Sequence, residues 1–147
     1  MSEQPRAKRI LIVDDEPDIV RYLEMLLQDQ GYETQSASDG REAMELARRE
    51  LPDLVTLDIS LPNMSGTKCY KELRTDPRLA AIPVIIVTAI VGFDGDPYAY
   101  ENFISHRRSV PPPEGFFPKP IDSQAFLAAV FDLLGRPAER GLQSAVK

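Results

Sequence analysis

Residues 9–17 read RILIVDDEP: an arginine, four apolar residues, three acids and a proline. The apolar part does not alternate with polar residues, which is typical of a strand that helices cover on both faces. The acids stand where this strand must end, and Pro17 fits the first turn of a helix. The stretch therefore predicts a buried strand whose carboxyl end carries carboxylates and leads directly into a helix.

The rest of the chain repeats this succession of strand and helix. Buried strands are also predicted at residues 54–57, 84–87 and 115–117, and an alternating edge strand at residues 32–36. Helical spacing of apolar residues begins at Pro17, after Asp39, at about Gly66 and after Asp122, and a further helix is predicted from Asp96. Repeated alternation of strand and helix predicts an α/β fold, a parallel sheet with helices on both faces and right-handed crossovers.

Length and composition restrict the class of protein. The chain has 147 residues, 43% of them hydrophobic and 27% charged, which predicts one globular domain rather than a disordered chain. It contains one cysteine, Cys69, so a disulfide framework and a multi-cysteine metal site are both excluded. No apolar stretch is long enough to span a bilayer and no signal sequence is recognisable, so a cytoplasmic protein without membrane contact is expected.

The negative charge is concentrated in the middle of the chain. Residues 10–135 hold 11 basic and 21 acidic residues, a net charge of −10, while both ends are basic. So acidic a surface is unsuited to nucleic acid, whose phosphates require a basic face. It suits a cation or a basic partner, although most of these acids need do no more than keep the chain in solution.

Polar side chains follow the strands at one edge of the predicted sheet. Ligands of open parallel sheets bind beyond the carboxyl ends of the strands, and there the sequence places Asp14, Asp15, Asp58, Thr88 and Lys119. Each has an ordinary explanation alone: one of the first two aspartates as a helix cap, Asp58 as a turn residue, the others as strand and surface residues. Together, however, three carboxylates repel one another unless a cation lies among them. Hard oxygen ligands suit Mg²⁺, and an ammonium and a hydroxyl beside it would hold phosphoryl oxygens.

Four motifs at these positions carry a family resemblance. The segments LIVDDEPD (11–18), LVTLDISLPNMSG (54–66), VIIVTA (84–89) and FFPKP (116–120) resemble the receiver domain of two-component response regulators. The resemblance covers about residues 8–135 and implies a flavodoxin-like, doubly wound sheet of five parallel strands in the order 2-1-3-4-5. Residues 1–8 are then an N-terminal extension, residues 9–135 the receiver domain and residues 136–147 a short tail. The sequence fits either a stand-alone receiver or part of a larger protein.

The resemblance implies a role for each acidic residue. Asp58 is the expected phosphoacceptor, which takes a phosphoryl group from a histidine kinase or a histidine phosphotransfer protein. Asp14 and Asp15 are the expected acidic pair that holds Mg²⁺ together with Asp58, and the backbone carbonyl of Ser60 is a further ligand. Such a protein is a phosphoacceptor in phosphorelay signal transduction rather than an enzyme, and it switches a partner-binding face.

The same resemblance assigns further residues to the response. Thr88 matches the hydroxyl that closes on the phosphoryl group, and Lys119 matches the lysine that pairs with it. Phe116 matches an aromatic residue that changes rotamer on activation, and without a phenolic hydroxyl it offers only a change in packing. Pro62 and Gly66 fit the turn into the third helix.

Two side chains, those of Ser60 and Ile90, flank the path that the resemblance implies for the water that hydrolyses the phosphoryl group. Isoleucine cannot form a hydrogen bond with this water and so cannot orient it. Slow dephosphorylation is therefore expected.

The connection between the fourth and fifth predicted strands is long. Residues 89–114 number 26, whereas two loops and a helix need roughly 15–24. The segment carries four aromatic residues, followed by Pro111 to Pro113. Residues 90–114, together with the last helix, are therefore expected to form the surface that binds an unknown downstream protein. An inert insertion is the alternative, since longer surface loops cost little free energy.

Three classes of function fit these patterns. The first is a phosphorylated signalling receiver. The second is a receiver fold that works as a constitutive interaction module without phosphorylation. The third, a phosphatase with an aspartate nucleophile, is disfavoured because it would need a general acid two residues after Asp58, where Ser60 stands.

Overall fold

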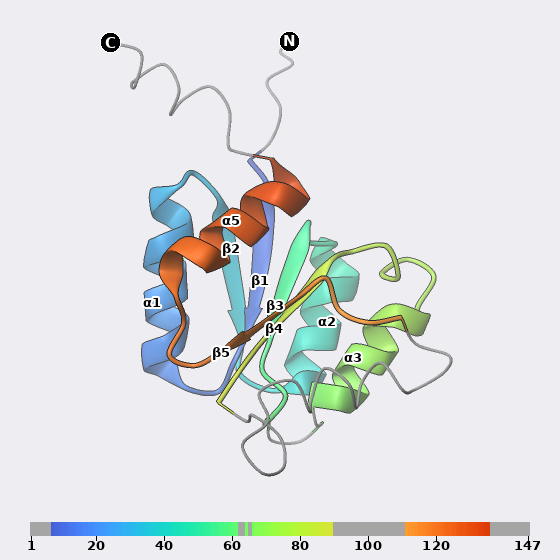
Figure 1. Ribbon diagram of the computed structural model, residues 1–147. Helices are drawn as coiled ribbons and strands as arrows, with labels where there is room; N and C mark the ends of the chain where they lie inside the picture. The colour runs from blue at the N-terminus through green and yellow to red at the C-terminus, as the bar shows by residue number, and fades with distance from the viewer. Residues whose placement is uncertain (1–6, 62–63, 65, 90–110, 136–147) are drawn as a thin grey trace, which may run out of the picture.

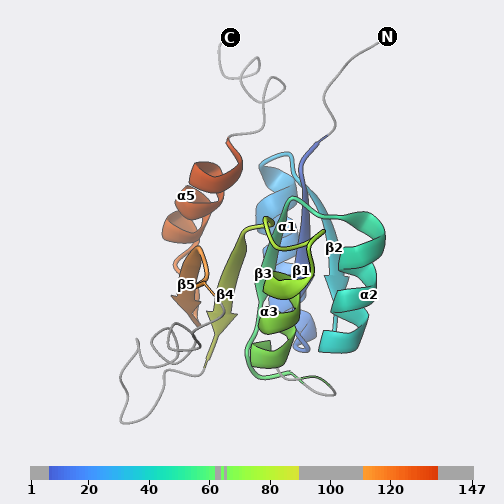
Figure 2. The same ribbon diagram turned by 90° about the vertical axis from the view of Figure 1, so that its right-hand side faces the viewer.

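The structure, a computed structural model, describes residues 7–61, 64, 66–89 and 111–135 (Figure 1). Five parallel strands form one sheet in the order β2-β1-β3-β4-β5, as the sequence predicts. The strands are β1 (Arg9–Val13), β2 (Glu33–Ala37), β3 (Leu54–Leu57), β4 (Val84–Thr88) and β5 (Gly115–Pro118). The helices of the described ranges are α1 (Pro17–Asp29), α2 (Gly40–Glu50), α3 (Gly66–Thr75) and α5 (Ser123–Leu134). Figure 2 shows the strands in this order, from β5 at one edge to β2 at the other.

The sheet separates two apolar cores, because each strand sends alternate side chains to opposite faces. On one face, Leu11 of β1 and Val55 of β3 pack with residues of α2 and α3. On the other face, Ile10 of β1 and Ile85 of β4 pack with residues of α1 and α5 (Figure 1). This double coverage is why the central strands read as continuous apolar runs rather than alternating ones.

Side-chain caps begin two of the helices where the sequence predicts them. Asp39 accepts a hydrogen bond from the backbone N–H of Glu42 at the start of α2 (2.8 Å). Glu42 in turn accepts a hydrogen bond from the backbone N–H of Ser38 (3.0 Å). Asp122 accepts hydrogen bonds from two backbone N–H groups in the first turn of α5 (3.1 and 3.2 Å). Each cap satisfies donors that the helix itself leaves unpaired, so these short polar residues fix where α2 and α5 begin.

Part of the enlarged connection lies outside the described residues. The helix predicted from Asp96 and the aromatic residues of the segment 90–114 all fall within residues 90–110. The exit of the segment, residues 111–114, is described and leads straight into β5. No helix in the described part of the chain has both the length and the apolar composition needed to cross a bilayer.

Cys69 is a packing residue of α3. Its side chain is fully buried, and its sulfur lies 3.9 Å from the sulfur of Met44 on α2. Burial raises the pKa of the Cys69 thiol to about 12, with a smaller contribution from the negative charge of Glu72. Because the thiolate is the reactive form of cysteine, the native side chain should be inert.

We therefore expect the native protein to react with a thiol reagent such as 5,5′-dithiobis(2-nitrobenzoate) only as fast as the core opens. Mildly alkaline buffer should not make the folded chain react directly, since the pKa of Cys69 is about 12 in the fold. Unfolding in urea should make the single thiol react at once, and the released chromophore measures both rates. Rapid labelling of folded protein would show that the α2–α3 core does not shield this side chain.

Candidate functional site

The strands that carry the carboxylates are neighbours in the sheet. Val13 of β1 lies opposite Leu57 of β3, and the next residue of each strand segment is an aspartate. The backbone N–H of Asp58 donates to the carbonyl of Val13 (3.0 Å), and that of Asp14 donates to the carbonyl of Ala37 (3.1 Å). Hydrogen bonding between strands thus continues one residue beyond them and holds Asp14 and Asp58 next to each other.

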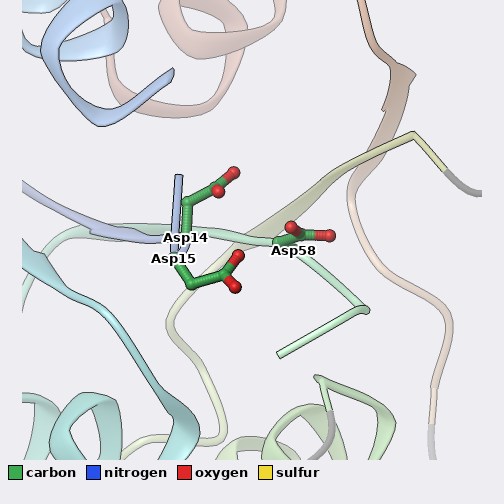
Figure 3. Close-up of side chains that lie close together, drawn as sticks. All are labelled: Asp14, Asp15 and Asp58. Atoms are coloured by element: carbon green, nitrogen blue, oxygen red, sulfur yellow. The ribbon is translucent and has the colours of Figure 1, made fainter. Parts of the chain in front are cut away.

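Asp15 completes the acidic cluster, which we define as Asp14, Asp15 and Asp58. One oxygen of each carboxylate lies within 4.8 Å of the others, and Figure 3 shows the side chains of Asp14 and Asp15 directed toward Asp58. Asp14 and Asp58 are 2% and 3% exposed, whereas Asp15 is exposed. Asp14 and Asp15 also line a cavity of about 360 Å³ beside α1. The acidic cluster is therefore buried at its base and accessible at one side.

Burial makes the ionised form of Asp14 unfavourable. Burial raises the pKa of Asp14, and the charge of Asp58 acts in the same direction. The backbone N–H of Glu16, 2.9 Å from Asp14 Oδ1, and the ammonium of Lys119 oppose this rise without cancelling it. A cation among the carboxylates would remove the cost of ionising all of them.

Lys119 brings one positive charge into the acidic cluster. Its Nζ lies 2.9 Å from Asp14 Oδ2, 3.3 Å from Asp58 Oδ2 and 3.5 Å from Glu16 Oε1. Burial alone would lower the pKa of Lys119, but its hydrogen bonds to Asp14 and Asp58 and their charges raise it overall. The backbone N–H of Lys119 donates to the carbonyl of Thr88 (2.9 Å), which ties the lysine to the end of β4. Among the described residues, one ammonium faces several carboxylates, which leaves this group of side chains with a net negative charge.

The donor set fits a hard divalent cation. Asp14, Asp15 and Asp58 offer carboxylate oxygens and no sulfur or imidazole, which favours Mg²⁺ or Ca²⁺ over softer metals. Mg²⁺ keeps several waters and binds phosphate oxygens alongside one or two carboxylates. The open side of the acidic cluster leaves room for such ligands. The three carboxylates thus fit the Mg²⁺ site that the motif resemblance implies.

Three of the other predicted site residues, Thr88, Phe116 and Ser60, lie in the described part of the chain. Thr88 is fully buried at the end of β4, and Phe116 of β5 is partly buried against the core under α2 and α3. Ser60 is exposed, and its backbone N–H donates to Asp58 Oδ1 (3.1 Å). Outside the described residues lie Pro62 and Ile90.

The alternative interpretation of Asp14 or Asp15 as a helix cap is wrong. The N-cap of α1 is Glu16, which makes no side-chain hydrogen bond to the helix. Pro17 occupies the first helical position and has no N–H to satisfy, so the helix end needs fewer cap partners. The carboxylates of Asp14 and Asp15 remain directed toward the site.

Two residues make contacts that bear on the site although nothing in the sequence had suggested a role for them. Glu16 approaches Lys119, and its place directly after the acidic pair was the only signal. Arg74 is buried on α3 and contacts the segment that precedes β5. Its helical position looks like that of any surface arginine, so no pattern in the sequence could have indicated it.

Gly66 supports the loop that carries Asp58. A Cβ atom at Gly66 would lie 2.3 Å from the Cα of Ile59 and 2.4 Å from the backbone oxygen of Asp58. The backbone N–H of Gly66 donates to the carbonyl of Ile59 (2.9 Å). Helix α3 thus begins in contact with the backbone of this loop, which confirms that Gly66 forms the turn into the third helix.

Comparison with known proteins identifies the family. Residues 10–107 match the family described as the response regulator receiver domain. The chain belongs to this receiver family. It is 36% identical over 128 residues to the polar-differentiation response regulator DivK of Brucella anthropi, an alignment that covers 87% of this chain and 97% of DivK. It is 37% identical over 125 residues to the response regulator PleD of Caulobacter vibrioides, covering 85% of this chain and 26% of PleD, so it spans about a quarter of that relative.

The receiver fold is also that of solved structures. The receiver domain of the sensor histidine kinase PA1611 of Pseudomonas aeruginosa PAO1 matches with a TM-score of 0.72 and 23% identity, over 88% of this chain and 99% of that chain. That protein has a magnesium ion coordinated in its active site cleft. A receiver domain is a phosphoacceptor signalling domain rather than a classical enzyme, and its general partner is a histidine kinase.

We expect Gly66→Ala to destabilise this receiver. The added methyl group meets backbone atoms that cannot move aside without displacing Asp58, and overpacking of this kind typically costs about 1–3 kcal/mol. Urea denaturation followed by circular dichroism measures the change. The matched control is Gly115→Ala, where the new Cβ meets only side-chain atoms at 3.3 Å or more. Equal stability of the two variants would show that α3 does not constrain the Asp58 loop.

Proposed function

We propose that this receiver accepts a phosphoryl group on Asp58 from a histidine kinase or a histidine phosphotransfer protein, and that it uses Mg²⁺ to do so. The observation that carries the proposal is the meeting of the acidic cluster with the ammonium of Lys119 at one edge of the sheet. The relatives named as response regulators support it. The fit of three carboxylates to a hard cation supports the choice of metal.

The contacts of Asp58 suit it to the role of nucleophile. In the proposed reaction an oxygen of Asp58 forms a bond to phosphorus as the bond from phosphorus to the donor's imidazole nitrogen breaks, and the imidazole departs. Negative charge then lies on the phosphoryl oxygens and must be balanced. Lys119 Nζ, 3.3 Å from Asp58 Oδ2, is close enough to pair with one of them. When bound by Asp14, Asp15, Asp58 and the carbonyl of Ser60, Mg²⁺ would neutralise the others.

We infer that Thr88 and Phe116 carry the response to this reaction. Thr88 ends β4, and in a receiver its hydroxyl would close on the phosphoryl group of Asp58. Phe116 stands on the adjacent strand β5, opposite Ile86 of β4. It is only partly buried, so its ring has room to change rotamer when β4 shifts. A change in packing at this edge of the sheet would transmit phosphorylation to the surface.

The output surface that we propose is the segment 90–114 with α5, within a receiver unit of residues 9–135. Tyr98, Tyr100, Phe93 and Phe103 would supply its aromatic anchors. The segment joins Thr88 to the strand of Phe116, so a movement at the phosphorylation site must reach it. The downstream protein would bind this surface differently in the phosphorylated and unphosphorylated states.

Phosphorylation itself is tested by mass spectrometry of the intact protein. Incubation with acetyl phosphate and Mg²⁺ should add the mass of one phosphoryl group. Asp58→Asn should abolish the adduct because an amide is a poor nucleophile, and a chelator should abolish it in the wild type. Asp132→Asn, which alters an exposed acid of α5, is the matched control and should keep it. An unmodified wild-type chain would contradict the proposal and favour a constitutive interaction module.

Metal binding should stabilise the fold, because the acidic cluster repels itself without a cation. At ten times its dissociation constant Mg²⁺ should add about 1.4 kcal/mol to the free energy of unfolding. For a domain of this size the melting temperature should rise by roughly 3–6 °C. Asp15→Ala should remove most of the shift, whereas Asp18→Ala, which removes a 97% exposed carboxylate on the first turn of α1, should keep it. An unchanged melting temperature on addition of Mg²⁺ would show that the metal site is misassigned.

The phosphorylated form should be long-lived, because Ile90 offers no group to orient the hydrolytic water. We expect Ile90→Glu to shorten its lifetime, since a carboxylate can bind that water, and Ile90→Leu to leave it unchanged. The measurement is the decay of the phosphoryl mass after the donor is removed. An unchanged or longer lifetime in Ile90→Glu would refute this role.

A further inference from the structure

A buried arginine lies at the end of the sheet where the strands begin, opposite the end that carries the acidic cluster. The side chain of Arg74, in the last turn of α3, is 3% exposed. It donates hydrogen bonds to the carbonyls of Ala80 (3.3 Å) and Ile82 (3.0 Å) and to the hydroxyl of Tyr70 (3.1 Å). Its guanidinium carbon lies 5.1 Å from the centre of the Tyr70 ring. So many contacts fix the guanidinium in one place.

A second set of contacts joins Arg74 to the segment that precedes β5. Its Nη2 forms an ion pair with the carboxylate of Glu114 and donates to the carbonyl of Pro112 (3.4 Å). The hydroxyl of Tyr70 donates to the carbonyl of Pro111. The Arg74 side chain is 3% exposed and that of Glu114 34%, so loss of Glu114 would leave a buried guanidinium without its charged partner, and this segment should stay attached to α3.

Glu114 extends the pairing of β4 with β5 by one residue. Its backbone N–H donates to the carbonyl of Val84 (2.9 Å), and its carboxylate accepts from the backbone N–H of Val84 (2.8 Å). Gly115 then lies opposite Ile85, and the register continues in step to the end of β4. The Glu114 carboxylate thus makes two contacts: it pairs with Arg74, and it accepts the hydrogen bond from Val84 with which the pairing of β5 begins.

β5 is a short strand, whose register also depends on the packing of Phe116 and Phe117 into opposite cores. It has four residues, and within the described ranges it is an edge strand that pairs with β4 alone. Its last residue, Pro118, has no N–H to donate. A slip of one residue would turn every side chain of the strand to the opposite face. Lys119 follows five residues after Glu114, about 17 Å away along an extended chain.

We propose that Arg74 is a positioning residue for Lys119. Through Glu114 it fixes the register of β5 on β4, and this register sets the ammonium between the carboxylates of Asp14 and Asp58. The consequence for phosphoryl transfer rests on the proposed function, whereas the register does not. The acidic cluster itself follows β1 and β3, whose pairing does not involve Glu114. Loss of Arg74 should thus impair phosphoryl transfer and spare metal binding.

The test compares Arg74→Met with Arg48→Met, which removes an arginine whose ion pairs with Glu72 and Asp76 lie on the exposed side of α2 and α3. The first readout, independent of phosphorylation, is acetylation of the Lys119 amine by an N-hydroxysuccinimide ester, followed by peptide mass spectrometry under conditions where both variants are folded. The second is the rate of phosphorylation by acetyl phosphate at saturating Mg²⁺. The third is the dissociation constant of Mg²⁺. Glu114→Gln serves as a milder second variant if Arg74→Met does not fold.

In Arg74→Met we expect faster acetylation of Lys119 and no loss of affinity for Mg²⁺, because moving an ammonium away from Asp14 and Asp58 cannot weaken their hold on a cation. Phosphorylation should slow by about 10–100-fold, the cost of a small misplacement of a catalytic group. In a Lys119→Ala background the same substitution should cause no further loss, because both act through one group. The proposal would be overturned if Lys119 of a folded Arg74 variant were acetylated at the wild-type rate. It would also be overturned if Arg74→Met slowed phosphorylation as much in the Lys119→Ala background as it does in the wild type. If the wild type is not phosphorylated, the proposed function fails, and acetylation of Lys119 alone decides the role of Arg74.

Discussion

Repulsion between carboxylates held close together is the constraint on which this structure depends. Asp14 and Asp58 are almost fully buried, their oxygens lie near those of Asp15, and one ammonium faces them. In the unfolded chain these charges would separate. In the fold, hydrogen bonds between neighbouring strands keep them together, and burial raises the pKa of Asp14. A cation relieves this unfavourable free energy, and a phosphoryl group brings oxygens that the same cation can bind. Metal binding and phosphoryl acceptance are therefore two parts of one electrostatic balance.

The sheet must be stiff to impose this arrangement, and its two apolar cores make it so. The strands that lead to the carboxylates are buried on both faces, with α1 and α5 on one side and α2 and α3 on the other. Gly66 brings α3 against the backbone of Asp58 and Ile59, which leaves these two residues little freedom. The hydrophobic free energy of the two cores thus offsets the cost of assembling like charges at their shared edge.

The ammonium of Lys119 reaches the site from an edge strand. Lys119 follows β5, an edge strand of four residues, while the acidic residues follow β1 and β3 in the centre. The position of Lys119 therefore depends on contacts at both ends of β5. Near the site, its backbone N–H donates to the carbonyl of Thr88, and before the start of the strand Glu114 pairs with Arg74. This arrangement makes a residue remote from the carboxylates part of the electrostatic balance.

Patterns in the amino-acid sequence were enough to predict the elements and the composition of the site. Continuous apolar runs predicted the central strands, Asp39 and Asp122 marked the helix starts, and the common direction of parallel strands brought Asp14, Asp58 and Lys119 to one edge. Motif resemblance then gave the strand order. Three features became visible in the folded chain alone: neither acid of the pair caps α1, Glu16 reaches Lys119, and Arg74 is buried. Arg74 meets Glu114 across 40 residues of sequence. Helical periodicity reports which face of a helix is apolar, but it cannot report that a distant carboxylate compensates a charge on that face.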